Sequence, residues 1–128
     1  MTSDDTTTIN ELRQKVQKFV DDRDWNKYHN PKDVAISIAI EAAELMEHFQ
    51  WIKENELDEV IKEKSAELQD ELADILIYCL SFANSVGIDI SHAVTQKIQK
   101  NESKYPIEEV KGNYKKYTEI RNNKPFHQ

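Results

Sequence analysis

The chain has 128 residues with only two glycines and three prolines, which suits one domain and favours helices over hairpin-rich sheets. Its formal net charge of −7 argues against a general nucleic-acid or membrane-surface binder, because phosphate backbones are bound through clustered lysine and arginine. The single cysteine, Cys79, excludes an internal disulfide. With a polar N-terminal stretch and no apolar run near ~20 residues, we expect a cytoplasmic protein without a membrane span.

Four segments have the apolar periodicity of helices, and the first two are marked by their caps. The first runs from about Glu11 to Asp22 behind a capping box that starts at Thr8. The second begins at Asn30, a suitable N-cap, followed by Pro31 in the first turn, and it extends to about Trp51.

The second half of the chain contains two further helices. The charged segment 53–66 is compatible with a loop, a short helix or the first turns of the next helix. The third helix spans roughly 67–86 and ends at a glycine, a common C-terminal cap. The fourth is capped by Asp89 or Ser91 and runs to about Ser103.

These helices predict one all-α domain over residues 1–106, a four-helix-type bundle, followed by a polar tail over 107–128 that is partly extended or disordered. The second and third helices are apolar around most of their circumference. Such helices are buried on more than one side, which a chain this short does not achieve alone. We therefore expect a homo-oligomer, most simply a two-fold dimer.

Two pairs of acidic residues stand inside these apolar helices. Glu41 and Glu44 lie three residues apart in IAIEAAELM, and Glu71 and Asp74 repeat the spacing in ELADILIYCL. Residues three apart share a helix face, so the pairs converge if the two helices are antiparallel neighbours. Buried carboxylates in such a group repel one another, and a hard divalent cation removes the repulsion. An all-oxygen set favours Mg²⁺, or alternatively Mn²⁺, and the sequence lacks the Glu-x-x-His motifs of di-iron bundles.

Residues that could hold a ligand flank the acidic helices. Trp25 can stack on a nucleobase, His29 can hydrogen-bond one, and Tyr78 follows Asp74 by one helical turn. Trp51 closes the second helix. Packing in a core or an interface is the simpler interpretation of each tryptophan taken singly. The fourth helix carries a polar stripe suited to phosphates or a base edge, or simply to solvent: Lys97, Asn101 and Lys104.

Three stretches carry a family resemblance: RDWNKYHNPKDVAISIAIEAAELMEHFQW, ELQDELADILIYCLSFANSVGIDI and KIQKNESKYP. Together, over roughly residues 12–106, they resemble the MazG-like all-α nucleotide pyrophosphohydrolases, and most closely the dCTP pyrophosphatase branch. The resemblance implies dimers or dimers of dimers with the site near the subunit interface. It also implies that the four acids bind Mg²⁺, that Lys97 and Lys104 face the phosphates, and that the remaining positions contact the nucleotide: Trp25, His29, Trp51, Tyr78 and Asn101.

We therefore expect Mg²⁺-dependent hydrolysis of a nucleoside triphosphate, dCTP or a modified dCTP above all, to the monophosphate and pyrophosphate. Water would attack in line between the α and β phosphoryl groups, with Glu44 or Glu47 as a candidate proton acceptor. Two alternatives from other classes are a non-catalytic helical dimerisation module, whose acids form interface ion pairs, and a nucleotide-sensing module without turnover. The sequence also leaves open dUTP and other triphosphates as substrates, and a tetramer in place of a dimer.

Overall fold

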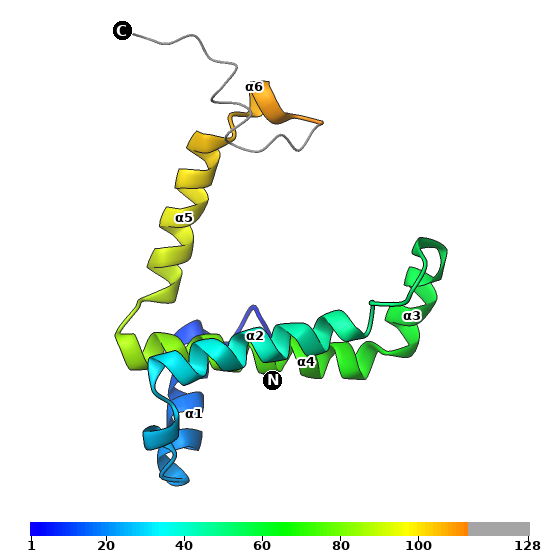
Figure 1. The fold of residues 1–128 in the computed structure, drawn as a ribbon. Helices are drawn as coiled ribbons and strands as arrows, with labels where there is room; N and C mark the ends of the chain where they lie inside the picture. Colours follow the sequence, from blue (N-terminus) through cyan, green and yellow to red (C-terminus); the bar gives the residue numbers. More distant parts are fainter. Residues whose placement is uncertain (113–128) are drawn as a thin grey trace, which may run out of the picture. The chain divides into compact units, whose positions relative to one another are not determined.

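The computed structural model describes residues 1–112 of the chain. All regular structure within this range is helical, which confirms the all-α prediction. The chain forms two compact units, Met1–Ile88 and Asp89–Gln128. The elements drawn in Figure 1 are, in chain order, α1 (Ile9–Asp22), η1 (Asn26–Tyr28), α2 (Pro31–Glu47), η2 (Glu54–Glu56), α3 (Leu57–Glu63), α4 (Ser65–Val86), α5 (Ile90–Lys104) and α6 (Ile107–Val110).

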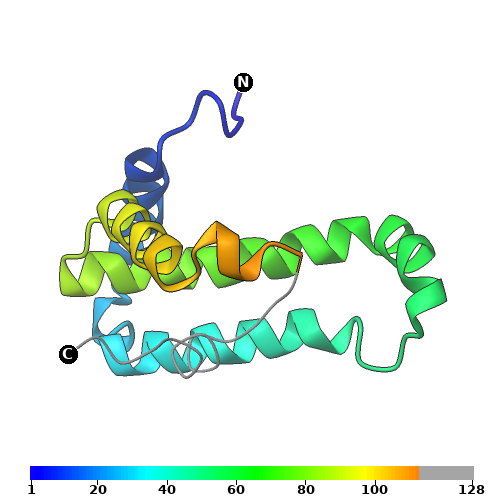
Figure 2. The ribbon, with the colours of Figure 1, turned by 90° about the horizontal axis from the view of Figure 1, so that it is seen from above.

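Helices α2 and α4 lie side by side in opposite directions, and they form the main packing contact of the first unit (Figures 1 and 2). α2 starts as predicted. The Asn30 side chain accepts a hydrogen bond from the Asp33 backbone N–H at 3.0 Å, and Pro31 occupies the first turn. An antiparallel pair is the arrangement that brings the two acidic pairs to one place.

The predicted end of α2 is wrong by about one turn. The helix ends at Glu47 rather than near Trp51. The chain continues over 48–51 as tighter turns, in which the Phe49 N–H donates to the Met46 carbonyl at 2.9 Å. Such turns satisfy carbonyls at a helix terminus that have no partner within the regular helix. The apolar periodicity of the sequence continues through these turns, which is why it predicted a longer helix.

The charged segment 53–66, which the sequence left open between a loop and a helix, folds mainly into η2 and α3. α4 begins at Ser65, inside that segment, and ends as predicted at Gly87. Gly87 has a left-handed φ of 75°, and its N–H donates to the Ala83 carbonyl at 2.9 Å. A residue with a Cβ is strained at such a φ, so the glycine sets the end of the helix.

The second unit contains α5 and α6. Asp89 caps α5 by accepting a hydrogen bond from the His92 N–H at 2.9 Å, which decides between the two predicted caps. Residues 107–110 form the helical turn α6 at the start of the segment expected to be a tail, and residues 113–128 lie outside the described part of the chain. Among the described helices, none is by itself long and apolar enough to cross a membrane, although α4 and α5 taken together pass that test by length and composition.

Helix α1 is fixed to the C-terminal end of α4 by one arginine. The Arg13 guanidinium donates to the Asn84 side-chain oxygen at 2.9 Å and to the Ile88 carbonyl at 2.7 Å. In return, the Asn84 amide donates to the Arg13 carbonyl at 3.1 Å. Bonds to a charged donor are stronger than neutral ones, so this contact sets the position of α1 along α4.

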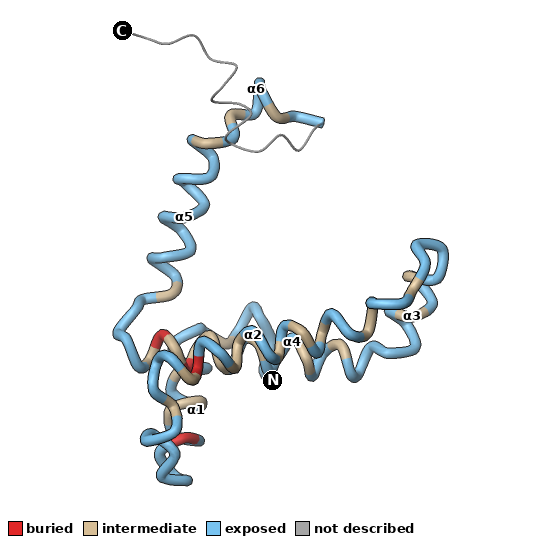
Figure 3. The backbone as a smooth tube through the Cα atoms, in the orientation of Figure 1, coloured by how far each residue is buried: buried red, intermediate tan, exposed pale blue. Residues whose placement is uncertain are grey.

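The buried core is small for the number of apolar residues in the chain (Figure 3). Among the described residues, the buried ones are Val20, Val34, Ser81 and Ala83. In contrast, four large side chains on α2 and α4 are each about half exposed, between 52% and 53%: Ile36, Ile40, Leu72 and Leu76. The first unit contributes α1, α2 and α4 to the predicted bundle, and these helices leave part of their own apolar surface uncovered.

Candidate active site

Three of the four predicted acids converge between α2 and α4. Glu41 and Glu44 from α2 and Glu71 from α4 each offer a carboxylate oxygen, and these oxygens all lie within 4.8 Å of one another. Asp74, one turn further along α4, is exposed and lies outside this group of three. Its charge nevertheless acts on the group, because it contributes to the raised pKa of Glu41. The three convergent carboxylates are called the acidic cluster below.

The acidic cluster is electrostatically strained. Burial raises the pKa of Glu41, and contact with the Glu44 carboxyl and the charges of Asp74 and Glu71 raise it further. Burial and Glu44 likewise raise the pKa of Glu71, while His48 acts in the opposite direction. Within the first unit, Met1–Ile88, no lysine or arginine forms an ion pair with these carboxylates. Because these like charges lie close together in a partly buried site, protonation of a carboxylate or binding of a cation is favoured.

The donors in the acidic cluster fit a divalent cation. One oxygen of Glu41, Oε2, and one of Glu71, Oε2, are buried from solvent and have no hydrogen-bond partner among the described residues. A buried carboxylate oxygen without a partner is costly, and a metal ion would supply the missing partner to both. All three donors are carboxylates, the ligand type that hard cations prefer.

A pocket of about 680 Å³ reaches Asp74, whose charge acts on Glu41 of the acidic cluster. α1, α4 and the segment that joins α1 to α2 line it, and Asp74 belongs to its wall. The α1 side includes Lys15 and Val16. Neither was among the predicted ligand-binding residues, because an isolated lysine and valine on an amphipathic helix have no distinguishing signal. The remaining wall is largely apolar, so the pocket suits an aromatic or aliphatic group rather than a phosphate.

Four rings form a continuous series along this pocket. Phe19 meets Trp25 edge to face, with centroids 5.9 Å apart and planes at 74°. Trp25 lies nearly parallel to His29 at 6.2 Å and 8°, and His29 nearly parallel to Tyr78 at 6.5 Å and 14°. Of these, Trp25, His29 and Tyr78 were predicted as ligand-binding residues, whereas Phe19 was not. Aromatic rings that line a pocket offer stacking surfaces for a flat ligand.

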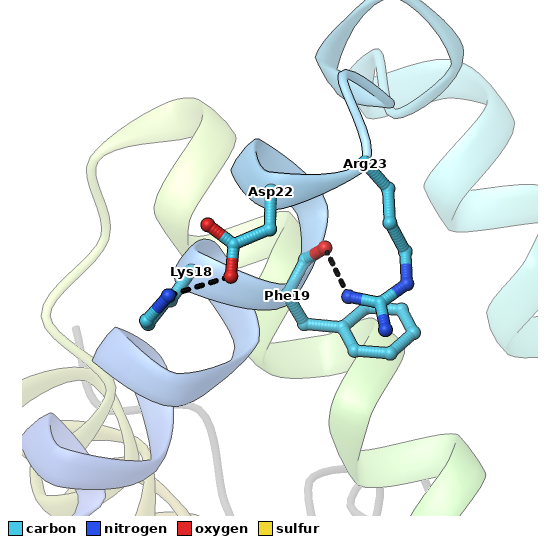
Figure 4. A network of polar contacts seen from close by, with 4 residues as sticks. All are labelled: Lys18, Phe19, Asp22 and Arg23. Carbon is cyan, nitrogen blue, oxygen red and sulfur yellow. Dashed lines mark hydrogen bonds and ion pairs between the residues drawn. The ribbon is translucent and has the colours of Figure 1, made fainter.

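Arg23 supports the outer end of the ring series (Figure 4). Its guanidinium carbon lies 3.7 Å from the centroid of the Phe19 ring, and its Nη1 donates to the Phe19 carbonyl at 3.1 Å. The cation thus covers one ring face and also satisfies a carbonyl near the end of α1. Figure 4 also shows the neighbouring Lys18–Asp22 ion pair, at 2.6 Å, which is solvent-exposed and contributes little to stability.

The segment that carries Trp25 and His29 is held by side-chain hydrogen bonds. Asp21 Oδ1 accepts bonds from Asn26 Nδ2 at 2.7 Å and from Gln17 Nε2 at 2.9 Å. These bonds lower the pKa of Asp21, so the carboxylate stays charged and the contacts persist at neutral pH. The Trp25 N–H also donates to the Val20 carbonyl at 3.0 Å. The pocket wall is therefore fixed by the chain itself.

His29 has one ring nitrogen committed to the backbone. Its Nδ1 lies 2.9 Å from the Trp25 carbonyl oxygen. A carbonyl oxygen only accepts, so Nδ1 carries the hydrogen and the neutral ring keeps Nε2 as an acceptor. The ring stacked between Trp25 and Tyr78 thus presents a hydrogen-bond acceptor at its other edge.

Comparison with known proteins places this arrangement in a family. The model of the MazG-like family matches residues 36–120, more than half of the chain. The chain belongs to the MazG-like family. Its relatives include dCTP pyrophosphatase 1 of Mus musculus, 34% identical over 116 residues, and that of Homo sapiens, 32% identical over 115 residues. Each match covers 88% of this chain and 68% of the relative. A crystal structure of a pyrophosphatase from Archaeoglobus fulgidus is 41% identical, with a TM-score of 0.75, covering 83% of this chain and 99% of that chain.

Four further residues of this MazG-like chain that were predicted to bind the ligand are not among those that line the pocket. Trp51 stands in the turns after α2, 85% exposed, and is not part of the pocket wall. Lys97, Asn101 and Lys104 lie on α5 in the second unit. Their contribution to the site remains a prediction. One residue beside the acids was missed: His48, four residues after Glu44, whose spacing on the same helix face was the available signal.

The strain in the acidic cluster predicts an unusual dependence of stability on pH. A carboxyl group with a raised pKa in the folded state contributes less to the free energy of unfolding as the pH rises. The loss begins at the ordinary pKa of the group, 4.5, and is complete above the raised pKa. The cation-free protein should therefore lose stability from this source as the pH rises above 4.5. Replacing Glu41→Gln should raise the melting temperature of the cation-free protein at neutral pH by roughly 3 °C and flatten its pH dependence.

The matched control is Glu59→Gln, which removes an exposed carboxylate of α3 outside the acidic cluster. Thermal unfolding followed by circular dichroism in the presence of a chelator measures both variants across this pH range. Equal pH profiles for Glu41→Gln and the wild type would show that the three carboxylates do not repel one another.

Proposed function

We propose that this chain, a nucleoside triphosphate pyrophosphohydrolase, hydrolyses dCTP or a modified dCTP to the monophosphate and pyrophosphate and uses Mg²⁺ to do so. The observation that carries the proposal is the position of Asp74, which lies in the wall of the ring-lined pocket and acts through its charge on Glu41 of the acidic cluster. One half of this site suits a cation with phosphates, and the other suits a base. The relatives named dCTP pyrophosphatase 1 support the same substrate class.

The cation would be held by Glu41, Glu44 and Glu71, with Asp74 as a fourth carboxylate. Oxygen ligands without nitrogen or sulfur favour Mg²⁺, and Mn²⁺ as a substitute, over zinc or iron. When bound, such a cation supplies charge neutralisation for the triphosphate, which the chain's net charge of −7 would otherwise repel. Lys97 and Lys104 belong to the proposal as phosphate contacts through the sequence resemblance alone, as do Trp51 and Asn101 as nucleotide contacts.

The base would occupy the pocket beside Trp25, His29 and Tyr78. Stacking on parallel rings accepts any base, so discrimination needs a polar contact. The acceptor that His29 keeps on Nε2 matches the exocyclic amino group of cytosine, whereas uracil and thymine present a carbonyl oxygen at the same position. If the Nε2 acceptor of His29 faced the carbonyl oxygen of uracil or thymine, both acceptors would lack a hydrogen-bond donor. A polar site rejects an analogue through the cost of such unpaired groups.

The chemical step needs a water molecule and a proton acceptor. Attack of water on the phosphorus and departure of pyrophosphate form one P–O bond and break another, and the water's proton must leave. Glu44 is an exposed member of the acidic cluster, and Glu47 lies three residues further along α2, also exposed. A carboxylate at either position would take the proton as a general base. Among the described residues we assign no covalent nucleophile, so a single in-line displacement is expected.

The site would be completed by a second copy of the chain. Ile36 and Ile40 on α2 are four residues apart, as are Leu72 and Leu76 on α4, so each pair makes a half-exposed apolar stripe on its helix. Contiguous apolar surface of this kind marks an interaction surface. A two-fold axis would place the same stripes of two copies against each other and bury both.

The first prediction concerns activity. Pyrophosphate release from a panel of nucleoside triphosphates should require Mg²⁺ and be fastest with dCTP or a 5-substituted dCTP. Glu41→Ala and Asp74→Ala should each lower the rate by at least ~100-fold, because each removes a proposed cation ligand. Glu59→Ala on α3 serves as the control and should retain wild-type activity. Undiminished turnover in both site variants would contradict the metal assignment, and no turnover in the wild type would favour a binding module.

The second prediction concerns base selection. His29→Ala should lower kcat/KM for dCTP by roughly tenfold and narrow the ratio of kcat/KM between dCTP and dUTP by a similar factor. Tyr78→Phe keeps the ring of Tyr78 and should leave the ratio unchanged. An unchanged dCTP to dUTP ratio in His29→Ala would exclude His29 as the residue that reads the base.

The third prediction concerns assembly. Sedimentation velocity should give the wild type a mass of two or four times the 15.0 kDa chain. Ile36→Glu combined with Ile40→Glu should shift the protein toward the 15.0 kDa species, because charges would replace the apolar stripe. Ile61→Glu is the matched control, since Ile61 is 48% exposed but lies on α3. A wild type that sediments as a single chain would contradict the dimer.

A further inference from the structure

His48 stands at the end of α2 beside the acidic cluster and has no role in the mechanism described above. It is the C-terminal cap residue of α2, one turn after Glu44. The antiparallel packing of α2 and α4 brings its Nε2 to 3.5 Å from Glu71 Oε1. Both side chains are largely buried, with 18% of the His48 side chain and 20% of the Glu71 side chain exposed. The contact therefore lies in a place where electrostatic interactions are strong.

The two oxygens of Glu71 have different surroundings. Oε1 faces His48, whereas Oε2 is buried and has no hydrogen-bond partner among the described residues. A carboxylate oxygen only accepts, so the histidine nitrogen that faces it must carry a hydrogen. The 3.5 Å separation between His48 Nε2 and Glu71 Oε1 is longer than a well-formed N–H···O bond but within ion-pair range.

We propose that His48 is a positioning residue for the cation site: it holds Glu71 through Oε1 and so keeps Oε2 available to the cation. The inference rests on the proposed function, because it takes the acidic cluster to be a metal site. Metal-binding carboxylates are commonly hydrogen-bonded on their remaining oxygen, and such a partner fixes the carboxylate's orientation before the metal arrives. Glu41, whose Oε2 is also buried without a partner, provides the facing ligand.

A direct ligand role for His48 is the main competing explanation. The ligand atoms that converge within 4.8 Å belong to Glu41, Glu44 and Glu71, and His48 is not among them. Its Nε2 is already directed at Glu71. A nitrogen ligand would also favour transition metals over Mg²⁺, whereas a positioning residue affects every cation through the same carboxylate.

Cation binding without nucleotide tests the inference. Free Mn²⁺ measured by electron paramagnetic resonance gives the dissociation constant of the full-length protein, and competition gives that of Mg²⁺. His48→Leu keeps the apolar volume without a donor, and His48→Gln keeps a side-chain N–H. We expect His48→Leu to weaken both cations by ~10-fold, the lower end of the range for such partners, and His48→Gln to recover most of the loss. His92→Leu, on α5, is the matched control and should bind as the wild type does.

Each result separates the explanations. Equal cation affinities for His48→Leu and the wild type would overturn the positioning role of His48. The proposed function would remain intact in that case, and pyrophosphate release by the wild type would confirm it. A loss confined to Mn²⁺, with no recovery in His48→Gln, would identify His48 as a ligand and also overturn it. A wild type that binds neither cation would overturn both this inference and the metal-dependent function. Thermal unfolding without cation checks that His48→Leu is folded.

Discussion

Repulsion among three carboxylates is the interaction on which the rest of this structure depends. Carboxylate oxygens of Glu41, Glu44 and Glu71 are brought within 4.8 Å of one another by the packing of α2 against α4, and no lysine or arginine of the first unit is paired to them. Helix packing therefore works against this local repulsion. Such a site favours cation binding, because a cation would remove the repulsion and supply a partner to two buried carboxylate oxygens.

The pocket beside the acidic cluster depends on a different kind of order. Part of its wall is a short connection between helices, which by length alone could take many conformations. Asp21 and its hydrogen bonds, together with the Arg23 contact on Phe19, hold that connection and so hold Trp25 and His29. A stacking surface fixed before the ligand binds costs less ordering entropy on binding. In both the acidic cluster and the ring series, neighbouring side chains fix the positions of the residues before a ligand binds.

Apolar surface that the single chain leaves exposed connects the fold to the proposed assembly. Val34 on α2 and Ala83 on α4 are buried, while Ile36, Ile40, Leu72 and Leu76 remain half exposed. A helix pair has one shared seam, so helices that are apolar on several sides require further partners. In the proposed dimer, the same two helices that carry the acids would also carry the subunit contact. Metal binding and assembly would then stabilise the same elements.

Much of this protein could be read from the sequence, because the responsible signals are local. Caps such as Thr8, Asn30 and Gly87 marked the helix ends, and the three-residue spacing of Glu41 and Glu44 placed both on one face. The resemblance to MazG-like proteins was likewise carried by contiguous stretches. The end of α2 was misplaced because apolar periodicity continues through tight turns after the helix has stopped.

Tertiary packing decided what local patterns do not contain. Only the antiparallel contact of α2 with α4 determines that Glu71 joins the acidic cluster while Asp74 stays outside it and lines the pocket. The same contact places His48 on Glu71, and the packing of α1 brings Lys15 and Phe19 to the pocket. These residues are distant in sequence and ordinary in type, so their roles follow from distances between helices. The sequence by itself determined which residues could carry the chemistry, and packing determined which of them meet.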